Sequence, residues 1–245
     1  MLKIQQKNEA RVEIESDFVW DAQDAYLFDI DGTLMRSRDR VHYESVAASV
    51  QRVTGFEITL AGVLIHGSTD TAILREACRQ AGIPDKVLES HYDAILEAMR
   101  SSVAERRHEL DPELTPGTEE VLRHLALRGR LLGVASGNLE AIGWIKIEKA
   151  GLREWFRFGG FSDHFPIRAE LIGHAAQMAR ELAGKGARIC VVGDTPRDIE
   201  AARANFLSVI AVATGKYSFD ELLRFQPEAC VSSLKDLMAM APSTK

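Results

Sequence analysis

The sequence contains few cysteines and no long apolar segment. Its three cysteines, Cys78, Cys190 and Cys230, are odd in number and form no C-x-x-C pair. Cys190 lies in an apolar, strand-like run, so we expect buried thiols in a reducing cytoplasm rather than disulfides. No apolar run approaches the ~20 residues that a membrane-spanning helix needs. Residues 1–15 have no apolar signal-peptide core. We therefore expect a cytoplasmic protein with no membrane partner.

The sequence also has no excess of basic residues. The chain has 30 Lys and Arg against 36 Asp and Glu, a formal charge of -6 and a pI near 5.7. A nucleic-acid-binding surface would be basic, so no nucleic-acid partner is expected. With 46% hydrophobic and 27% charged residues, the 245-residue chain has the composition of an ordinary globular protein, with no internal repeat. Its oligomeric state, monomer or homodimer, is left open.

Two kinds of pattern divide the chain. Apolar, strand-like runs alternate with helical segments after about residue 114, and one such run occurs earlier, at residues 25–28. This alternation predicts an α/β fold with a doubly wound, Rossmann-like parallel sheet. Residues 36–113 carry only the apolar spacing of helices. We therefore expect a catalytic core of residues 1–35 and 114–245 with an inserted all-α cap domain of residues 36–113.

The expected elements of the core follow from the same patterns. Helices are predicted at residues 118–129, 139–150, 168–183 and 196–204, and strands at residues 131–136, 188–193 and 208–214 and near Cys230, with a short strand in the run FRFGGFS, residues 156–162. Asn138 and Gly151 are expected to cap the second of these helices.

The most informative stretch is AYLFDIDGTL, residues 25–34. An apolar strand ends at two carboxylates, Asp29 and Asp31, and the chain then turns through Gly32 and Thr33. In open α/β sheets, reactive groups gather beyond the carboxyl ends of the strands. Two neighbouring carboxylates repel each other unless a cation lies between them, and Mg²⁺ is bound by one or two carboxylates together with water and substrate phosphate. The alternative is a solvated acidic turn.

A second polar signature, ASGN at residues 135–138, follows another strand. It brings Ser136 and Gly137 to the start of a helix, where unpaired N–H groups bind phosphate. The alternative is that Ser136 and Asn138 only cap the helix.

A third signature, VVGDTPRDIEAA, covers residues 191–202. Asp194 comes directly off a strand, and Asp198 lies in the first turn of the following helix. Both carboxylates are predicted metal ligands at the same sheet edge as Asp29. For Asp198, an equal alternative is that it only complements the helix dipole.

These motifs, in this order, resemble those of the haloacid dehalogenase superfamily of phosphotransferases. The helical insertion is similar to the cap of its phosphoglycolate phosphatase and β-phosphoglucomutase-like branch, and HGSTDTAIL, residues 66–74, resembles a loop that this branch presents to the active site. The resemblance covers nearly the whole chain. It implies a magnesium-dependent phosphatase that hydrolyses a small phosphorylated metabolite.

The resemblance and the chemistry together assign catalytic roles. Asp29 is predicted to be the nucleophile that forms an aspartyl-phosphate, and Asp31 the general acid and base. Two sets of binding residues are also implied. The metal ligands are Asp29, Asp31 through its backbone carbonyl, Asp194 and Asp198; the phosphate-binding residues are Thr33, Ser136, Gly137 and Arg168.

The chain differs from the superfamily's usual pattern at the fixed cation that binds phosphate, which is usually a lysine. At the matching place, just before a helix, this chain has Arg168, which stays charged and can form two parallel hydrogen bonds to phosphate. Lys146, on the preceding helix, is the alternative. It is expected to lie on a solvated helix face.

Three other functions share these motifs in whole or in part. A sugar-phosphate mutase returns the phosphoryl group to its substrate, a phosphoaspartate signalling receiver combines acids, a hydroxyl and a cation, and a binding protein would be catalytically silent. The acid at Asp31 favours phosphate ester chemistry over dehalogenation. The substrate itself is not identified by the sequence. Six residues are candidates to face it from the cap and linkers: Arg36, Arg38, His42, Tyr43, His66 and Ser68.

Overall fold

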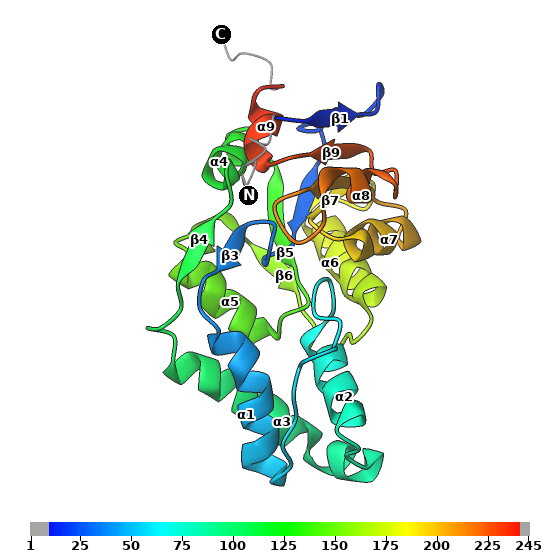
Figure 1. Ribbon diagram of the computed structural model, residues 1–245. Helices are drawn as coiled ribbons and strands as arrows, with labels where there is room; N and C mark the ends of the chain where they lie inside the picture. Colours follow the sequence, from blue (N-terminus) through cyan, green and yellow to red (C-terminus); the bar gives the residue numbers. More distant parts are fainter. Residues whose placement is uncertain (1–9, 241–245) are drawn as a thin grey trace, which may run out of the picture.

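The computed structural model describes residues 10–240, and the predicted absence of a signal peptide concerns residues that lie largely outside this range. The main sheet has seven strands in the order β1-β9-β8-β7-β2-β5-β6 (Figure 1). Its strands are β1 Val12–Ile14, β2 Ala25–Phe28, β5 Leu131–Ala135, β6 Phe158–Gly160, β7 Ile189–Gly193, β8 Ser208–Val212 and β9 Ala229–Val231. Every neighbouring pair is parallel except β1 with β9. The predicted doubly wound α/β fold is confirmed.

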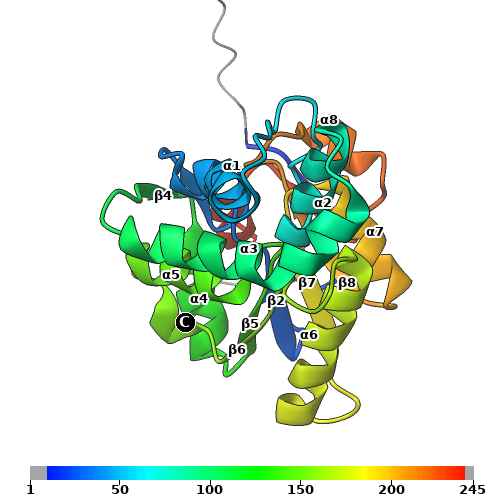
Figure 2. The ribbon, with the colours of Figure 1, turned by 90° about the horizontal axis from the view of Figure 1, so that it is seen from below.

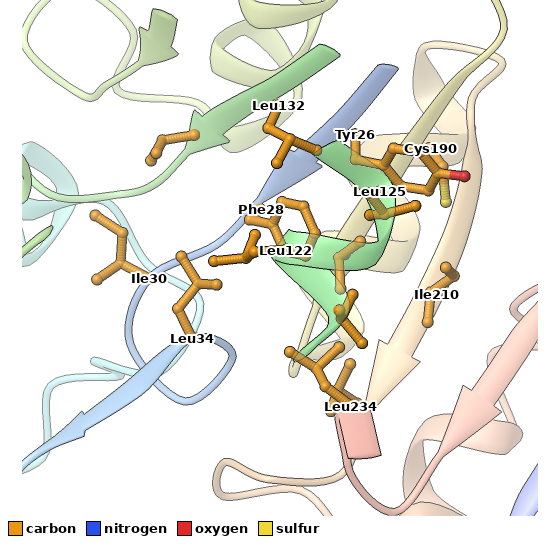
Figure 3. Close-up of a cluster of buried hydrophobic side chains, with 14 of the residues drawn as sticks. Tyr26, Phe28, Ile30, Leu34, Leu122, Leu125, Leu132, Cys190, Ile210 and Leu234 are labelled. Carbon is orange, nitrogen blue, oxygen red and sulfur yellow. The ribbon is translucent and has the colours of Figure 1, made fainter. Parts of the chain in front are cut away.

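Strand β2 lies inside this sheet, between β7 and β5, and its side chains alternate between the two faces. Tyr26 and Phe28 belong to one apolar cluster, whereas Ala25 and Leu27 belong to the other. Figure 3 shows Phe28 beside Leu122 and Tyr26 beside Leu125, both leucines on helix α4. Because both faces are covered, all four residues of β2 are buried.

Helices cover both faces of the sheet (Figures 1 and 2). Side chains of α4 Thr118–Leu127, α5 Glu140–Lys149 and α9 Leu234–Met238 pack in the first cluster. Those of α6 Arg168–Ala183, α7 Pro196–Ala204 and α8 Phe219–Leu223 pack in the second. A short 3-10 helix, Arg153–Trp155, precedes β6. No helix within residues 10–240 is both long enough and apolar enough to cross a membrane.

Three further helices form a separate group, here called the helical unit. They are α1 Val41–Thr54, α2 Asp70–Gln80 and α3 Asp85–Glu105. They share their own apolar cluster, which also takes in Leu139 and Ile142 from the start of α5. In Figure 1 the helical unit lies below the sheet.

The connections to the helical unit contain two strands that the sequence patterns missed. Strands β3 Met35–Ser37 and β4 Pro112–Leu114 form an antiparallel pair in which Met35 faces Leu114. Each strand has only three residues, too few for alternation to show. The pair joins the segment that enters the helical unit to the segment that leaves it.

The three cysteines are free and buried, as expected. Their predicted cytoplasmic setting stays a prediction.

Candidate active site

Three carboxylates meet at the carboxyl edge of the sheet. The register places Phe28 beside both Val134 and Val192, so strands β2, β5 and β7 end together. Asp29 follows β2 and Asp194 follows β7, while Asp198 lies in the first turn of α7. One oxygen from each of Asp29, Asp194 and Asp198 lies within 4.8 Å of the other two.

This acidic cluster is buried, and its charges repel. Burial raises the pKa of Asp29 to about 6, with the charges of Asp198 and Asp31 adding to the effect and Arg168 opposing it. Burial also holds the pKa of Asp194 well above its usual value, and Asp29 and Asp198 raise it further. Carboxylates in such a position favour either protons or a cation between them. The donor set, oxygen only and anionic, fits Mg²⁺.

Asp194 is held in place by close backbone and hydroxyl contacts. The Thr33 hydroxyl donates to Asp194 Oδ1 at 3.2 Å. Gly32 has φ +92°, and a Cβ atom there would lie 2.4 Å from Asp194 Oδ2. Only glycine accepts both the backbone angle and the approach. Thr33 is itself fully buried, and its hydroxyl, which was predicted to bind phosphate, is bonded to Asp194 in this structure.

The Gly32 contact leads to a testable expectation. Gly32→Ala should lower activity on the order of a hundredfold if Asp194 is the metal ligand that the sequence predicts, because the new methyl group would displace it. Gly55→Ala is the matched control, since Gly55 has φ +78° with nothing within 4 Å of its Cβ position. Both variants should lose ~1 kcal/mol of stability from backbone strain. Thermal melting and phosphate release measure the two effects, and equal activity of the two variants would refute the role of the close approach.

Arg168 is the first residue of α6 and is buried among these acids. Its Nη2 atom lies 2.9 Å from Asp29 Oδ1 and 2.6 Å from Asp198 Oδ1, and its Nε donates to Asp198 at 2.8 Å. Asp198 also accepts from the Thr195 N–H at 3.0 Å, which completes a capping box on α7. The predicted fixed cation therefore lies beside the predicted nucleophile, and Asp198 joins the cation to a helix start.

Asp31 has a second cation of its own. Lys146 Nζ donates to Asp31 Oδ1 at 2.9 Å and to Oδ2 at 2.7 Å, and Asn138 Nδ2 donates to Oδ2 at 2.9 Å. The Lys146 side chain is 5% exposed and that of Asp31 is 42% exposed. Loss of water around Asp31 raises its pKa. The charge of Lys146 and the hydrogen bonds from Lys146 and Asn138 outweigh this effect and hold the pKa below its usual value.

The expectation that Lys146 lies on a solvated helix face was wrong. Helix α5 buries Ile142, Gly143 and Ile147 as well as Lys146, because it packs between the sheet and the helical unit. The signal was present in the sequence AIGWIKI, where Lys146 stands between two isoleucines and the other charged residues of the helix lie only at its ends. The lysine could then be buried only with a carboxylate partner.

The prediction that Asn138 caps α5 was also wrong. The N-cap residue is Leu139, with no side-chain hydrogen bond, and α5 begins at Glu140. The Asn138 amide instead bridges the site: its Oδ1 accepts from Lys146 at 3.0 Å, and its Nδ2 donates to Ser136 Oγ at 2.8 Å. Asn138 is thus a site residue that sequence reasoning treated only as a helix signal.

A cavity of about 230 Å³ opens over these groups and reaches the helical unit. The core side of its lining includes the predicted catalytic and phosphate-binding residues Asp29, Asp31, Ser136, Gly137 and Arg168. On the other side, the cavity is lined by residues between Ser37 and Ile73, including four of the six candidate substrate-facing residues: His42, Tyr43, His66 and Ser68.

The two remaining candidates point elsewhere. Arg36 Nε donates to the Thr214 carbonyl at 2.7 Å, and Arg38 pairs with Glu113 across β3 and β4. Neither lines the cavity among the residues that the structure describes.

The start of α2 and the loop before it dock onto the core beside the cavity. The Asp70 N–H donates to the Gly137 carbonyl at 2.7 Å, and Asp70 Oδ2 accepts from the Leu139 N–H at 2.8 Å. Arg197 of α7 donates to Ser68 Oγ at 2.7 Å. The helical unit therefore closes over the ends of β5 and β7 through hydrogen bonds.

The parallel sheet, the carboxylates at its edge and the inserted helices are together typical of one class of hydrolases. Residues 23–205 match the profile of haloacid dehalogenase-like hydrolases, and the chain belongs to this family. The family predicted from the motifs is confirmed.

Two curated relatives that match the sequence are phosphoglycolate phosphatases. The phosphoglycolate phosphatase of Agrobacterium fabrum (strain C58 / ATCC 33970) is 27% identical over 222 residues, which cover 89% of this chain and 90% of the relative. That of Mesorhizobium japonicum (strain LMG 29417 / CECT 9101 / MAFF 303099) is 31% identical over 117 residues, or 48% of this chain and 51% of the relative. Family and relatives together support a phosphatase enzyme.

Solved structures share the fold. CbbY from Rhodobacter sphaeroides, in complex with phosphate, has a TM-score of 0.64 at 18% identity, covering 88% of this chain and 96% of that chain. A predicted phosphoglycolate phosphatase from Haemophilus somnus 129pt has a TM-score of 0.63 at 19% identity, with coverages of 89% and 97%.

Proposed function

We propose that the protein is a magnesium-dependent phosphatase that hydrolyses a small phosphomonoester through an aspartyl-phosphate at Asp29. The observation that carries this proposal is the acidic cluster itself. Asp29 stands in it with one oxygen 2.9 Å from a buried guanidinium, and Asp31 faces the same cavity from two residues away. A nucleophile, an acid or base and an anion-binding cation are therefore within reach of one phosphoryl group.

The metal would be held by Asp29, Asp194 and the backbone carbonyl of Asp31, with Asp198 supporting them through Arg168. Bound Mg²⁺ would offset the repulsion between the anionic nucleophile and the anionic substrate. Arg168, Ser136 and the N–H of Gly137 would bind the phosphoryl oxygens, and Thr33 would orient Asp194.

In the first half of the reaction, an Asp29 oxygen attacks phosphorus and the bond to the leaving alcohol breaks. The alcohol oxygen takes a proton from Asp31. In the second half, Asp31 accepts a proton from the water that attacks phosphorus, and Asp29 is released with inorganic phosphate. Lys146 favours the carboxylate form of Asp31 that this second half needs, whereas a substrate dianion beside Asp31 favours the protonated form that the first half needs.

The helical unit is proposed to act as the cap domain, with residues 36–113 as the insertion and residues 1–35 and 114–245 as the catalytic core. Its docking bonds to Gly137 and Leu139 hold it over the cavity, where its closure on a bound substrate would exclude water. A mutase would use the same groups, so release of inorganic phosphate without isomerisation of a hexose phosphate is the distinguishing result. The protein is proposed to work in the cytoplasm, as a monomer or homodimer.

Removal of the metal tests the proposal. We expect phosphate release from p-nitrophenyl phosphate to stop in excess chelator and to return with added Mg²⁺. Since the cluster repels itself without a cation, Mg²⁺ should also raise the melting temperature. Asp194→Asn should lose the melting shift together with the activity. Undiminished turnover in chelator would contradict the proposal.

A further inference from the structure

The proposed function leaves open which alcohol the phosphoryl group is attached to. That alcohol must occupy the part of the cavity formed by residues 37–73, here called the alcohol side, because the opposite wall holds the carboxylates and phosphate-binding groups. The alcohol and the phosphoryl group share this cavity of about 230 Å³.

The cavity lining contains two lysine or arginine side chains among the described residues, and both are already paired. Lys146 donates to both oxygens of Asp31, at 2.9 and 2.7 Å. Arg168 lies 2.9 Å from Asp29 and 2.6 Å from Asp198. Both cations belong to the phosphoryl end, so neither serves a second anionic group of the substrate.

The alcohol side instead carries acids. Asp39 accepts from the N–H groups of Val41 at 3.0 Å and Asp111 at 2.8 Å, and no lysine or arginine pairs with it in the described chain. Asp70 faces His42 Nε2 at 3.0 Å, and its side chain is 7% exposed. A substrate carboxylate here would lose water beside two carboxylates, and His42 Nε2 is already bonded to Asp70.

The other polar groups of the alcohol side are neutral. Burial lowers the pKa of His66 and the charge of Lys216 lowers it further, against an opposing effect of Asp31, so its surroundings favour the neutral imidazole. Lys216 is exposed and lies outside the cavity lining. Ser37, Ser68 and Tyr43 offer hydroxyl groups.

Apolar side chains complete this wall of the cavity. Val46, Leu60, Ile65 and Ile73 all line it, and each belongs to or packs against the apolar cluster of the helical unit. They favour carbon atoms over charged groups.

We propose that the natural substrate is the phosphomonoester of a small uncharged alcohol and not that of a hydroxy acid. The proposal rests on the phosphatase function proposed above and adds the class of leaving group. It separates this chain from relatives named for phosphoglycolate, whose leaving group carries a carboxylate.

A panel of small phosphomonoesters of similar size tests this inference with the full chain and Mg²⁺. The panel consists of 2-hydroxyethyl phosphate, n-propyl phosphate, 2-phosphoglycolate and phosphoethanolamine, with p-nitrophenyl phosphate as a general phosphatase substrate. We expect kcat/KM for the better neutral ester to exceed that for 2-phosphoglycolate and phosphoethanolamine by at least about tenfold, or ~1.4 kcal/mol.

The outcomes separate the two proposals. No hydrolysis of any ester, p-nitrophenyl phosphate included, would reject the phosphatase function. Two results would overturn the leaving-group class while leaving the phosphatase function standing. In the first, p-nitrophenyl phosphate is hydrolysed and kcat/KM for 2-phosphoglycolate or phosphoethanolamine equals or exceeds that for the neutral esters. In the second, p-nitrophenyl phosphate is hydrolysed but none of the small esters is. Preference for 2-phosphoglycolate that disappears in Lys216→Met would overturn it by showing that Lys216 reaches the substrate.

A gain-of-charge variant adds an independent arm. Ser37, exposed on β3 at the cavity wall, can be changed to arginine, with Ser37→Gln as the matched neutral control. If the missing cation is what disfavours carboxylates, Ser37→Arg should raise the ratio of kcat/KM for 2-phosphoglycolate over 2-hydroxyethyl phosphate by about tenfold, and Ser37→Gln should not. An unchanged ratio in a folded Ser37→Arg variant would contradict the inference.

Discussion

Asp29→Asn is expected to abolish turnover while the fold remains intact. The amide is nearly isosteric with the carboxylate but cannot attack phosphorus, and loss of a covalent nucleophile typically costs a thousandfold or more, on the order of 10⁶ in some enzymes. The fold should tolerate the change because the pKa of Asp29 is raised to about 6 by burial and by neighbouring acids. Its charge is thus unfavourable to the native state at neutral pH.

Phosphate release and thermal melting check this result together. Asp220→Asn is the control for the same chemical change, since Asp220 is an exposed partner of Arg11 with a side chain 64% exposed. It should keep wild-type activity. A folded Asp29→Asn protein with wild-type rates would remove Asp29 from the mechanism.

Lys146→Met is expected to lower kcat roughly 100-fold, the usual cost of removing one fixed electrostatic contact in an active site. The methionine fills similar space but leaves Asp31 with Asn138 as its remaining side-chain hydrogen-bond donor. The carboxyl group then loses both its orientation and the charge that favours its ionised form.

Lys149→Met is the matched control for this loss. Lys149 lies one turn further along α5, is exposed and bonds only the His108 carbonyl. Its replacement should leave kcat unchanged. If the two variants behave alike in steady-state kinetics, Lys146 has no role beyond packing.

The sequence predicted the elements that depend on local patterns. The strand that ends at Asp29 and the helix that begins at Arg168 were predicted at the bounds the structure shows. Each is marked by its own residues: an apolar run ending in an acid, and a helical period. The carboxylates of Asp194 and Asp198 were placed together because parallel strands end at one edge.

The sequence failed where a side chain's partner lies far along the chain. Lys146 and Asp31 are 115 positions apart, and helical spacing cannot show that α5 is enclosed by the sheet on one side and the helical unit on the other. Asn138 was taken for a helix cap because asparagine before a helix usually is one. Its amide instead faces Asp31 and Lys146, a choice made by tertiary packing.

The central claim is that a covalent aspartyl-phosphate forms at Asp29. Borohydride reduces an acyl phosphate to the alcohol, so enzyme quenched during turnover of p-nitrophenyl phosphate with Mg²⁺ should carry homoserine at position 29, detected by peptide mass spectrometry. We expect this conversion at Asp29 and not at Asp31, and none in excess chelator. Steady hydrolysis with Asp29 unmodified, or with Asp31 modified in its place, would contradict the mechanism.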